Sequence, residues 1–594
     1  MKKIIFIRSP TDLVAAYKYI DLSSENNFNH LNEQNLIDLS SIYSKYGKKW
    51  LEDFSLLLSE LNRENSSMLW WAYTSTAKNL LSSPLGDRYV QVNAVCEIVK
   101  REDINVLYIL GATPGQMQSI ASTLSDSNVG ISGNAWKLRH LYKIVEIAKT
   151  FARQPIICAH AFFGFFGHRI DSKKKLVDVC IFTYLDGELH DEKDNYFGKL
   201  PQLIKENLNV KSTHYLAYVY PPFRRRMQML LRANNKTPYI ALFGMLEISD
   251  YISVLTRVTQ NWLSNSLSVN KYFFGKAKKH SSLFFESFLH DIAVGGFLHN
   301  LLIYKSIGRY LKVYEPKFLI YPYENKALEK MILLGVYDSQ SRPEVIGYQH
   351  TSITPRHITL FFNSDEAKYT PLPDKIITVG SVTREYLEKN GNYPKQIFAT
   401  GCALRQSWPE TLPHRNDRVN TRVLLALSSS VNELIQAVTY LQKVMILMPN
   451  IELGIRPHIN FPLAMLPDDL LYWVNSKAQD FSGTLLEDNL FWCSATVYVS
   501  STVALETLMR GKPIINFSVG DMISPDPVIG EVPFHWCVNN ESEMVNILSQ
   551  LKGMSESYYE DCSLRAINYV RDYLKPIDNA GLQEFICKNN KVIN

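Results

Sequence analysis

Two segments decide the fold of this chain, IELGIRPH at residues 451–458 and ATVYVSSTVALETLMRGKPII at residues 495–515. Ala495–Val499 is apolar and β-branched, which is typical of a buried strand. Apolar residues then recur at helical spacing over Val503–Arg510, Gly511 ends that helix, and Ile514–Phe517 reads as a further strand. The pattern predicts a βαβ unit of a parallel sheet.

Three hydroxyl residues, Ser500, Ser501 and Thr502, stand where this strand meets its helix. A helix N-terminus offers unpaired N–H groups and positive potential, so hydroxyls there suit phosphate. The alternative is that Ser500 or Ser501 is only an N-cap.

The earlier segment ends a strand at Glu452–Ile455 and continues as Arg456-Pro457-His458. An Arg fork can hold a phosphate at two oxygens, and a His can donate to one. The two turns are about one βα crossover apart, so we expect their strands to be adjacent. Their phosphate ligands would then meet at the carboxyl ends of the strands, where open α/β sheets bind ligands.

This pair of turns resembles the HP and SS/ST motifs of bacterial sialyltransferases and related GT-B enzymes that use CMP-activated sugars; here Pro precedes His. The resemblance implies that His458, Ser500, Ser501 and Thr502 hold the CMP phosphate. It also implies that Glu506, one helical turn past Thr502, contacts the donor ribose; the alternative is an ordinary Glu of a first helical turn. CDP-glycerol glycerophosphotransferases carry similar turns on the same fold, so cytidine is common to both.

Composition constrains the class of protein without identifying it. The chain has 594 residues, so we expect more than one domain. A net charge of +5 and a pI near 8.5 are compatible with an anionic donor or a membrane surface and diagnostic of neither, and we expect no nucleic-acid partner. Its eight Cys include no CxxC pair, which predicts neither a zinc knuckle nor a disulfide framework. Met1–Ile7 reads as a strand, and no apolar run is long enough to cross a membrane, so we expect a cytoplasmic protein with peripheral contact to the inner membrane.

Polar residues follow several predicted strands of the first half. Asp186 follows the strand Val177–Tyr184, Glu324 follows Phe318–Tyr321, and His350 follows Val345–Tyr348. A carboxylate and a His at one sheet edge suit proton transfer from a sugar hydroxyl. The alternatives are a solvated turn for Asp186, a helix cap for Glu324 and a buried, hydrogen-bonded ring for His350.

The fold expected from these elements is α/β and GT-B-like, with two Rossmann-like domains facing a cleft. The acceptor-side domain spans 1–405, with strands at Lys3–Ile7 and Asn105–Leu110 and a helical insertion at about 238–310. A Pro-rich and charged linker covers 406–420, the nucleotide-sugar domain covers 421–575, and 576–594 form a tail. In the second domain Ser428 and Ser429 open the first helix and also point to the donor phosphate.

The function expected is transfer of an acidic sugar, a nonulosonic acid or Kdo, from a CMP-sugar to a surface polysaccharide or lipid-linked glycan. Basic and hydroxyl groups can neutralise a single phosphate, so no metal or other cofactor is expected. Three alternatives remain open: a CDP-glycerol or CDP-ribitol phosphotransferase, a UDP-sugar epimerase, and a non-catalytic polysaccharide-assembly protein.

Overall fold

The computed structural model describes residues 19–21, 40–80, 82–101, 106–126, 130–133, 148, 152, 175–185, 194–219, 239–267, 275–409, 422–427, 431–517 and 523–587. The predicted strand Lys3–Ile7 lies outside these residues. So do Asp186, Ser428 and Ser429.

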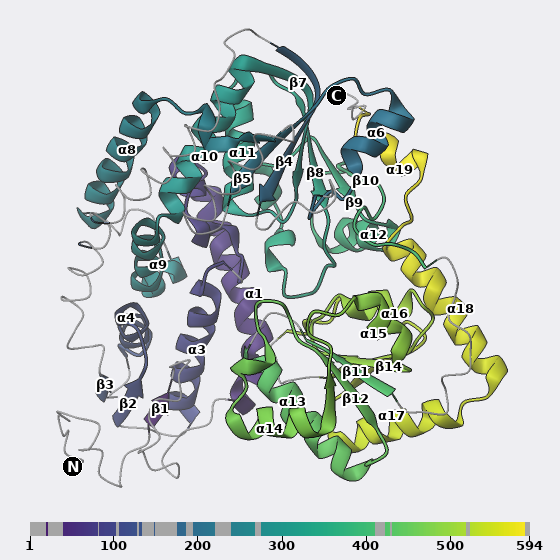
Figure 1. The fold of residues 1–594 in the computed structure, drawn as a ribbon. Helices are drawn as coiled ribbons and strands as arrows, with labels where there is room; N and C mark the ends of the chain where they lie inside the picture. The colour runs from purple at the N-terminus through teal and green to yellow at the C-terminus, as the bar shows by residue number, and fades with distance from the viewer. Residues whose placement is uncertain are drawn as a thin grey trace.

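The C-terminal sheet has six parallel strands in the order β13-β12-β11-β14-β15-β16 (Figure 1). Their bounds are β11 Arg422–Ala426, β12 Glu452–Arg456, β13 Ala478–Asp480, β14 Ala495–Tyr498, β15 Ile514–Phe517 and β16 His535–Val538. Numbered from β11, the order is 3-2-1-4-5-6, which is the doubly wound Rossmann order. The predicted βαβ unit is confirmed as β14, α16 and β15.

The larger N-terminal sheet repeats this plan with seven parallel strands in the order β10-β9-β8-β7-β4-β5-β6. Their bounds are β4 Lys175–Leu185, β5 Thr213–Val219, β6 Tyr239–Ala241, β7 Tyr314–Pro322, β8 Glu344–Gln349, β9 Lys375–Thr378 and β10 Phe398–Thr400. Its strand order also reverses once, between β4 and β7. The fold is therefore α/β with two Rossmann-like domains, as the sequence predicts.

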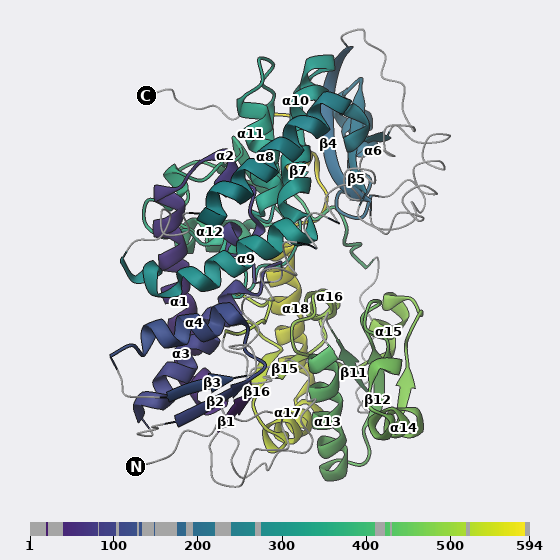
Figure 2. The ribbon, with the colours of Figure 1, turned by 90° about the vertical axis from the view of Figure 1, so that its left-hand side faces the viewer.

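A third, smaller sheet was not predicted. It joins β1 (Tyr19–Asp21), β2 (Val106–Leu110) and β3 (Gly130–Gly133), all parallel. The strand predicted at Asn105–Leu110 is thus present, but it belongs to this small sheet and not to the main N-terminal one. Figure 2 shows the small sheet below α3 and α4, away from the teal strands of the larger sheet.

Helices cover the sheets on both faces. Their bounds are α1 Ser40–Glu64, α2 Met68–Trp71, α3 Leu85–Arg101, α4 Pro114–Thr123, α6 Leu200–Leu208, α8 Ile248–Leu267, α9 Ser281–Val294, α10 Gly296–Val313, α11 Ala327–Tyr337, α12 Ser381–Asn390, α13 Val431–Leu447, α14 Asp468–Lys477, α15 Leu486–Trp492, α16 Val503–Leu508, α17 Glu541–Gly553, α18 Glu556–Tyr573 and α19 Asn579–Gln583.

The range predicted as a helical insertion, 238–310, begins with the short edge strand β6, which was not predicted, and continues with α8, α9 and most of α10. Its helices share one core with α1 and α2, where Phe54 and Trp70 meet Phe284 and Phe288. The described residues contain no helix that is long and apolar enough to cross a membrane.

The C-terminal helices return to the first domain. Figure 1 shows α18, in yellow, running from the green domain toward α19 beside the teal sheet. Lys575 joins the end of β9 to the segment after β10, because its N–H donates to Val379 O (2.9 Å) and its O accepts from the Ala403 N–H (2.8 Å). The Lys375 ammonium also donates to Cys587 O at 2.6 Å.

Candidate functional site

The site is built on the carboxyl edge of the C-terminal sheet, where three strands end level with one another. Ala426 of β11 pairs with Arg456 of β12 on one side and with Tyr498 of β14 on the other. The predicted adjacency of β12 and β14 is therefore wrong, because β11 lies between them. Local sequence patterns predict where strands lie in the chain, but the order of the strands in the sheet depends on packing between residues far apart in the sequence. The order reverses between β11 and β14, where α/β sheets of this kind bind ligands.

Glu433, in the first turn of α13, bonds the loop after β14, and its role was not predicted from the sequence. The Ser500 hydroxyl donates to Glu433 Oε2 at 3.0 Å, from the loop after β14 to the first turn of α13. Burial lowers the pKa of His458, and the Glu433 carboxylate opposes that shift, so the His458 ring lies within its field. Ser500 thus bonds a buried carboxylate whose charge also reaches His458. The only signal in the sequence was an acidic residue in a first helical turn.

The other two hydroxyls differ in their partners. Ser501 Oγ accepts from the Val503 N–H at 3.4 Å, but the N-cap position of α16 is Thr502, so neither Ser500 nor Ser501 is the N-cap of the alternative interpretation. Because that oxygen accepts, its own proton remains to donate to a ligand. Thr502 is exposed at the start of α16 and makes no side-chain capping bond.

Arg456 and Glu506 form the charged side of this edge. Arg456 Nη1 donates to Thr484 O (2.9 Å) and to Asn489 Oδ1 (2.6 Å), which fixes the plane of the guanidinium. Burial raises the pKa of Glu506, while the charges of Arg510, Arg405 and Arg456 oppose the shift. The Glu506 carboxylate therefore lies within the field of three arginines.

On the first domain, the structure brings Glu324 and His350 together as predicted. Their Oε1 and Nε2 atoms are 3.5 Å apart, and Lys326 forms an ion pair with the other carboxylate oxygen. Burial opposes ionisation of Glu324, but Lys326 and His350 hold its pKa below the ordinary value. Burial lowers the pKa of His350 to about 4, so its ring is neutral at physiological pH. His350 therefore orients Glu324 and cannot serve as an acid there.

Glu329 is a second residue that the sequence analysis missed. Both of its carboxylate oxygens accept from the Glu324 N–H, at 3.1 and 2.9 Å. Burial raises its pKa to about 8, and the nearby Glu324 carboxylate adds to this. Glu329 thus shapes the turn that presents Glu324, which includes Asn325 at a φ of 56°.

The charge of Arg405 acts on titratable groups at the carboxyl edges of both sheets. It is exposed in the segment after β10, and its charge bears on both His350 in the first domain and Glu506 in the second. A cation at that position suits an anionic ligand held between the two domains.

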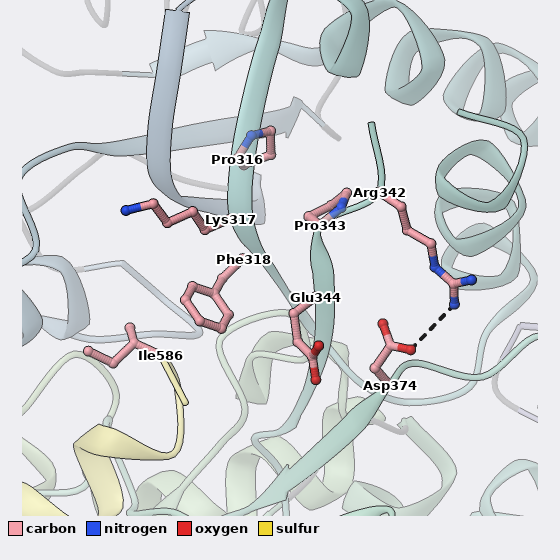
Figure 3. Close-up of a pocket in the computed structure, with 8 residues that line it drawn as sticks. All are labelled: Pro316, Lys317, Phe318, Arg342, Pro343, Glu344, Asp374 and Ile586. Atoms are coloured by element: carbon pink, nitrogen blue, oxygen red, sulfur yellow. Dashed lines mark hydrogen bonds and ion pairs between the residues drawn. The ribbon is translucent and has the colours of Figure 1, made fainter. Parts of the chain in front are cut away.

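A pocket of about 720 Å³ lies elsewhere (Figure 3). It is lined by Pro316, Lys317, Phe318, Arg342, Pro343, Glu344, Asp374 and Ile586. Pro316 and Glu344 stand near the starts of β7 and β8, so this pocket occupies the amino edge of the sheet. Glu324 and His350 follow the opposite ends of the same strands, and the pocket is therefore not part of the candidate site.

Comparisons with known proteins give remote structural likenesses. No family model matches the chain, and no curated protein matches it by sequence. A lipopolysaccharide outer core galactosyltransferase, WaaB, aligns over 69% of this chain and 98% of its own, at 10% identity and a TM-score of 0.41. UDP-GlcNAc 2-epimerase from Neisseria meningitidis aligns over 68% of this chain and 98% of its own, at 11% identity and a TM-score of 0.39. The calicheamicin glycosyltransferase CalG4 covers 70% of this chain and 100% of its own, at 13% identity and a TM-score of 0.40.

Proposed function

We propose that the chain is a GT-B glycosyltransferase that uses a CMP-activated acidic sugar, a nonulosonic acid or Kdo. The observation that carries the proposal is that β11, β12 and β14 end level at the switch point of the C-terminal sheet, where Ser500 donates to Glu433 and the Arg456-Pro457-His458 turn begins. The acceptor would be a surface polysaccharide or a lipid-linked glycan. The proposal places the protein in the cytoplasm, in peripheral contact with the inner membrane.

The donor side needs groups that neutralise one phosphate as CMP leaves. Ser501 and Thr502 supply hydroxyl protons, and a neutral His458 supplies one N–H. The backbone N–H of Asn460 donates to His458 Nδ1 at 3.2 Å, which leaves the ring proton on Nε2. Preorganised donors of this kind stabilise charge that develops on a leaving group, and they can do so without a metal.

Glu433 is the acidic member of this set. A carboxylate would repel a phosphate in direct contact, so its role is to orient the Ser500 hydroxyl and to accept from a sugar hydroxyl. Glu506 is the proposed acceptor for the ribose hydroxyls; burial raises the pKa of Glu506, and the charges of Arg456 and Arg405 offset part of that shift.

The acceptor side uses Glu324 as the general base. Its lowered pKa keeps the carboxylate ionised at physiological pH, and a quarter of the side chain is exposed. Asp186 remains a second candidate base, outside the described residues.

The test is a transfer assay that offers CMP-Kdo, CMP-sialic acid, CDP-glycerol and UDP-sugars with lipopolysaccharide and capsule fragments as acceptors. We expect CMP release with an acidic-sugar donor. Glu324→Gln should lower turnover by about 10²- to 10⁴-fold, the usual range for loss of a general base, with CMP affinity unchanged. Glu385→Gln, on the exposed face of α12, is the matched control.

Three results would contradict the proposal. Turnover of CDP-glycerol alone would make the protein a polyol phosphotransferase. Conversion of a UDP-sugar without an acceptor would make it an epimerase. No turnover and no nucleotide binding would favour an assembly protein that retains the fold.

A further inference from the structure

A cluster of three metal-binding side chains lies outside the candidate site. Among the described residues, one ligand atom each from Asp526, His535 and Cys537 lies within 4.8 Å of the other two. His535 Nε2 is 2.8 Å from Asp526 Oδ2, and Cys537 Sγ is 3.9 Å from that oxygen and 3.7 Å from that nitrogen. All three atoms thus face one point.

The fold explains why these residues meet. His535 and Cys537 are two apart on β16, so a strand presents both side chains on one face. They pair with Ile514 and Asn516 of β15. Asp526 comes from the loop between these strands and lies against β14. A His-Trp-Cys triplet on a strand lacks CxxC spacing, so the cysteine pattern of the sequence did not predict this cluster.

Asp526 is held in place from behind. Its Oδ1 atom accepts from the Tyr498 hydroxyl at 2.8 Å and from the Val528 N–H at 3.0 Å. Its Oδ2 atom is the one that faces His535 and Cys537. Outer partners of this kind orient metal-binding carboxylates in known sites.

We propose that Asp526 Oδ2, His535 Nε2 and Cys537 Sγ bind a Zn²⁺ ion. A thiolate, an imidazole and a carboxylate are the ligands that zinc prefers, with bonds of about 2.0–2.3 Å. Tetrahedral bonds of that length separate ligand atoms by roughly 3.3–3.6 Å, so the observed distances need only small adjustments. Zinc replaces the proton that His535 shares with Asp526, and the Cys537 thiol releases its proton to solvent. Because Cys537 is exposed, a water completes the coordination.

The ion would fasten the loop 523–532 to the edge strand at the junction of the domains. Pro527 O in this loop accepts from the Tyr573 hydroxyl at 3.0 Å, and the same hydroxyl accepts from the Ile353 N–H of the first domain at 3.1 Å. Ile523 and Ile529 also pack against the core of the first domain. Zinc at this position would stabilise that junction.

The first experiment titrates metal-stripped full-length protein with Zn²⁺ against a chromophoric chelator. We expect one tight equivalent per chain in the wild type and in Cys587→Ser, which removes another exposed thiol. Cys537→Ser should lose that equivalent or bind at least about tenfold more weakly, as should Tyr498→Phe through its effect on Asp526. Circular dichroism confirms that each variant is folded.

The second experiment replaces zinc with Co²⁺, whose thiolate charge-transfer band reports coordination by sulfur. The band should appear in the wild type and in Cys587→Ser and be absent from Cys537→Ser. No tight equivalent in the wild type, or a band that survives in Cys537→Ser, would overturn the proposal.

Discussion

Glu324 and Glu329 are five residues apart, yet their surroundings give them opposite protonation behaviour. Lys326 keeps Glu324 ionised, whereas burial raises the pKa of Glu329 to about 8. The sequence predicted Glu324, because it follows a very apolar strand. It could not reveal Glu329 or Glu433, because their roles depend on which loops lie against them.

The raised pKa of Glu329 makes part of the stability depend on pH. The folded state holds the proton more tightly than the unfolded state, where the pKa is near 4.5. Its contribution is therefore complete below that value and is lost as pH rises through about 8. We expect the free energy of unfolding of the wild type, relative to Glu329→Gln, to fall by about 1–4 kcal/mol between pH 5 and pH 8. Denaturant unfolding at several pH values measures this. A difference that does not change with pH would contradict the expected protonation of Glu329.

Lys326 controls the same site through Glu324. Lys326→Met should raise the pKa of Glu324, because the ion pair that favours the carboxylate is removed. The acidic limb of the pH profile of kcat/KM should then move to higher pH, while Lys389→Met, an exposed lysine on α12, leaves it in place. An unchanged profile in Lys326→Met would exclude Glu324 as the base.

At the scale of elements, the local pattern predicted β14, α16 and β15 to within about two residues at either end. Apolar runs, hydroxyls and a glycine with a φ of 64° mark those boundaries directly. The order of the strands was not predicted correctly, because β11 inserts between β12 and β14 through contacts that are remote in sequence. The third sheet was missed for the same reason.

Lys512, just before β15, bonds the carbonyl groups at the C-terminal end of α15. Its buried ammonium donates to the backbone oxygens of Leu490, Phe491 and Cys493, at 2.8, 2.9 and 2.6 Å. Lys512→Met would leave these carbonyls unpaired and should cost about 2–4 kcal/mol of unfolding free energy. Chemical denaturation compares it with Lys477→Met, an exposed lysine on α14. Equal stability of the two variants would show that the three bonds contribute nothing net.

At the scale of the whole molecule, α18 and the residues after it bind the two Rossmann-like domains together. The buried Tyr573 hydroxyl links Ile353 in the first domain to Pro527 in the second. Composition and motif spacing predicted two such domains. Neither could place individual bridging residues, because a single Tyr on an amphipathic helix reads only as a core position.

Tyr573→Phe tests that bridge. It removes both hydrogen bonds while keeping the ring, so we expect a loss of about 1–3 kcal/mol. Calorimetric unfolding should show a lower melting temperature or two separated transitions. Tyr472→Phe, on an exposed tyrosine of α14, should behave as the wild type does. Equal melting temperatures of the two variants would show that the Tyr573 hydrogen bonds contribute no net stability.

The central claim is that the carboxyl edge of the C-terminal sheet binds the phosphate of a cytidine nucleotide. Calorimetric titration with CMP, CDP and UDP tests it most directly, in the wild type, His458→Ala, Ser501→Ala and the control Ser549→Ala on α17. We predict that CMP binds the wild type and the control, and that each of the two site variants binds it at least about tenfold more weakly, as expected when a hydrogen bond to a charged group is lost. Equal CMP affinity in all four proteins, or binding of UDP with no response to CMP, would contradict the account.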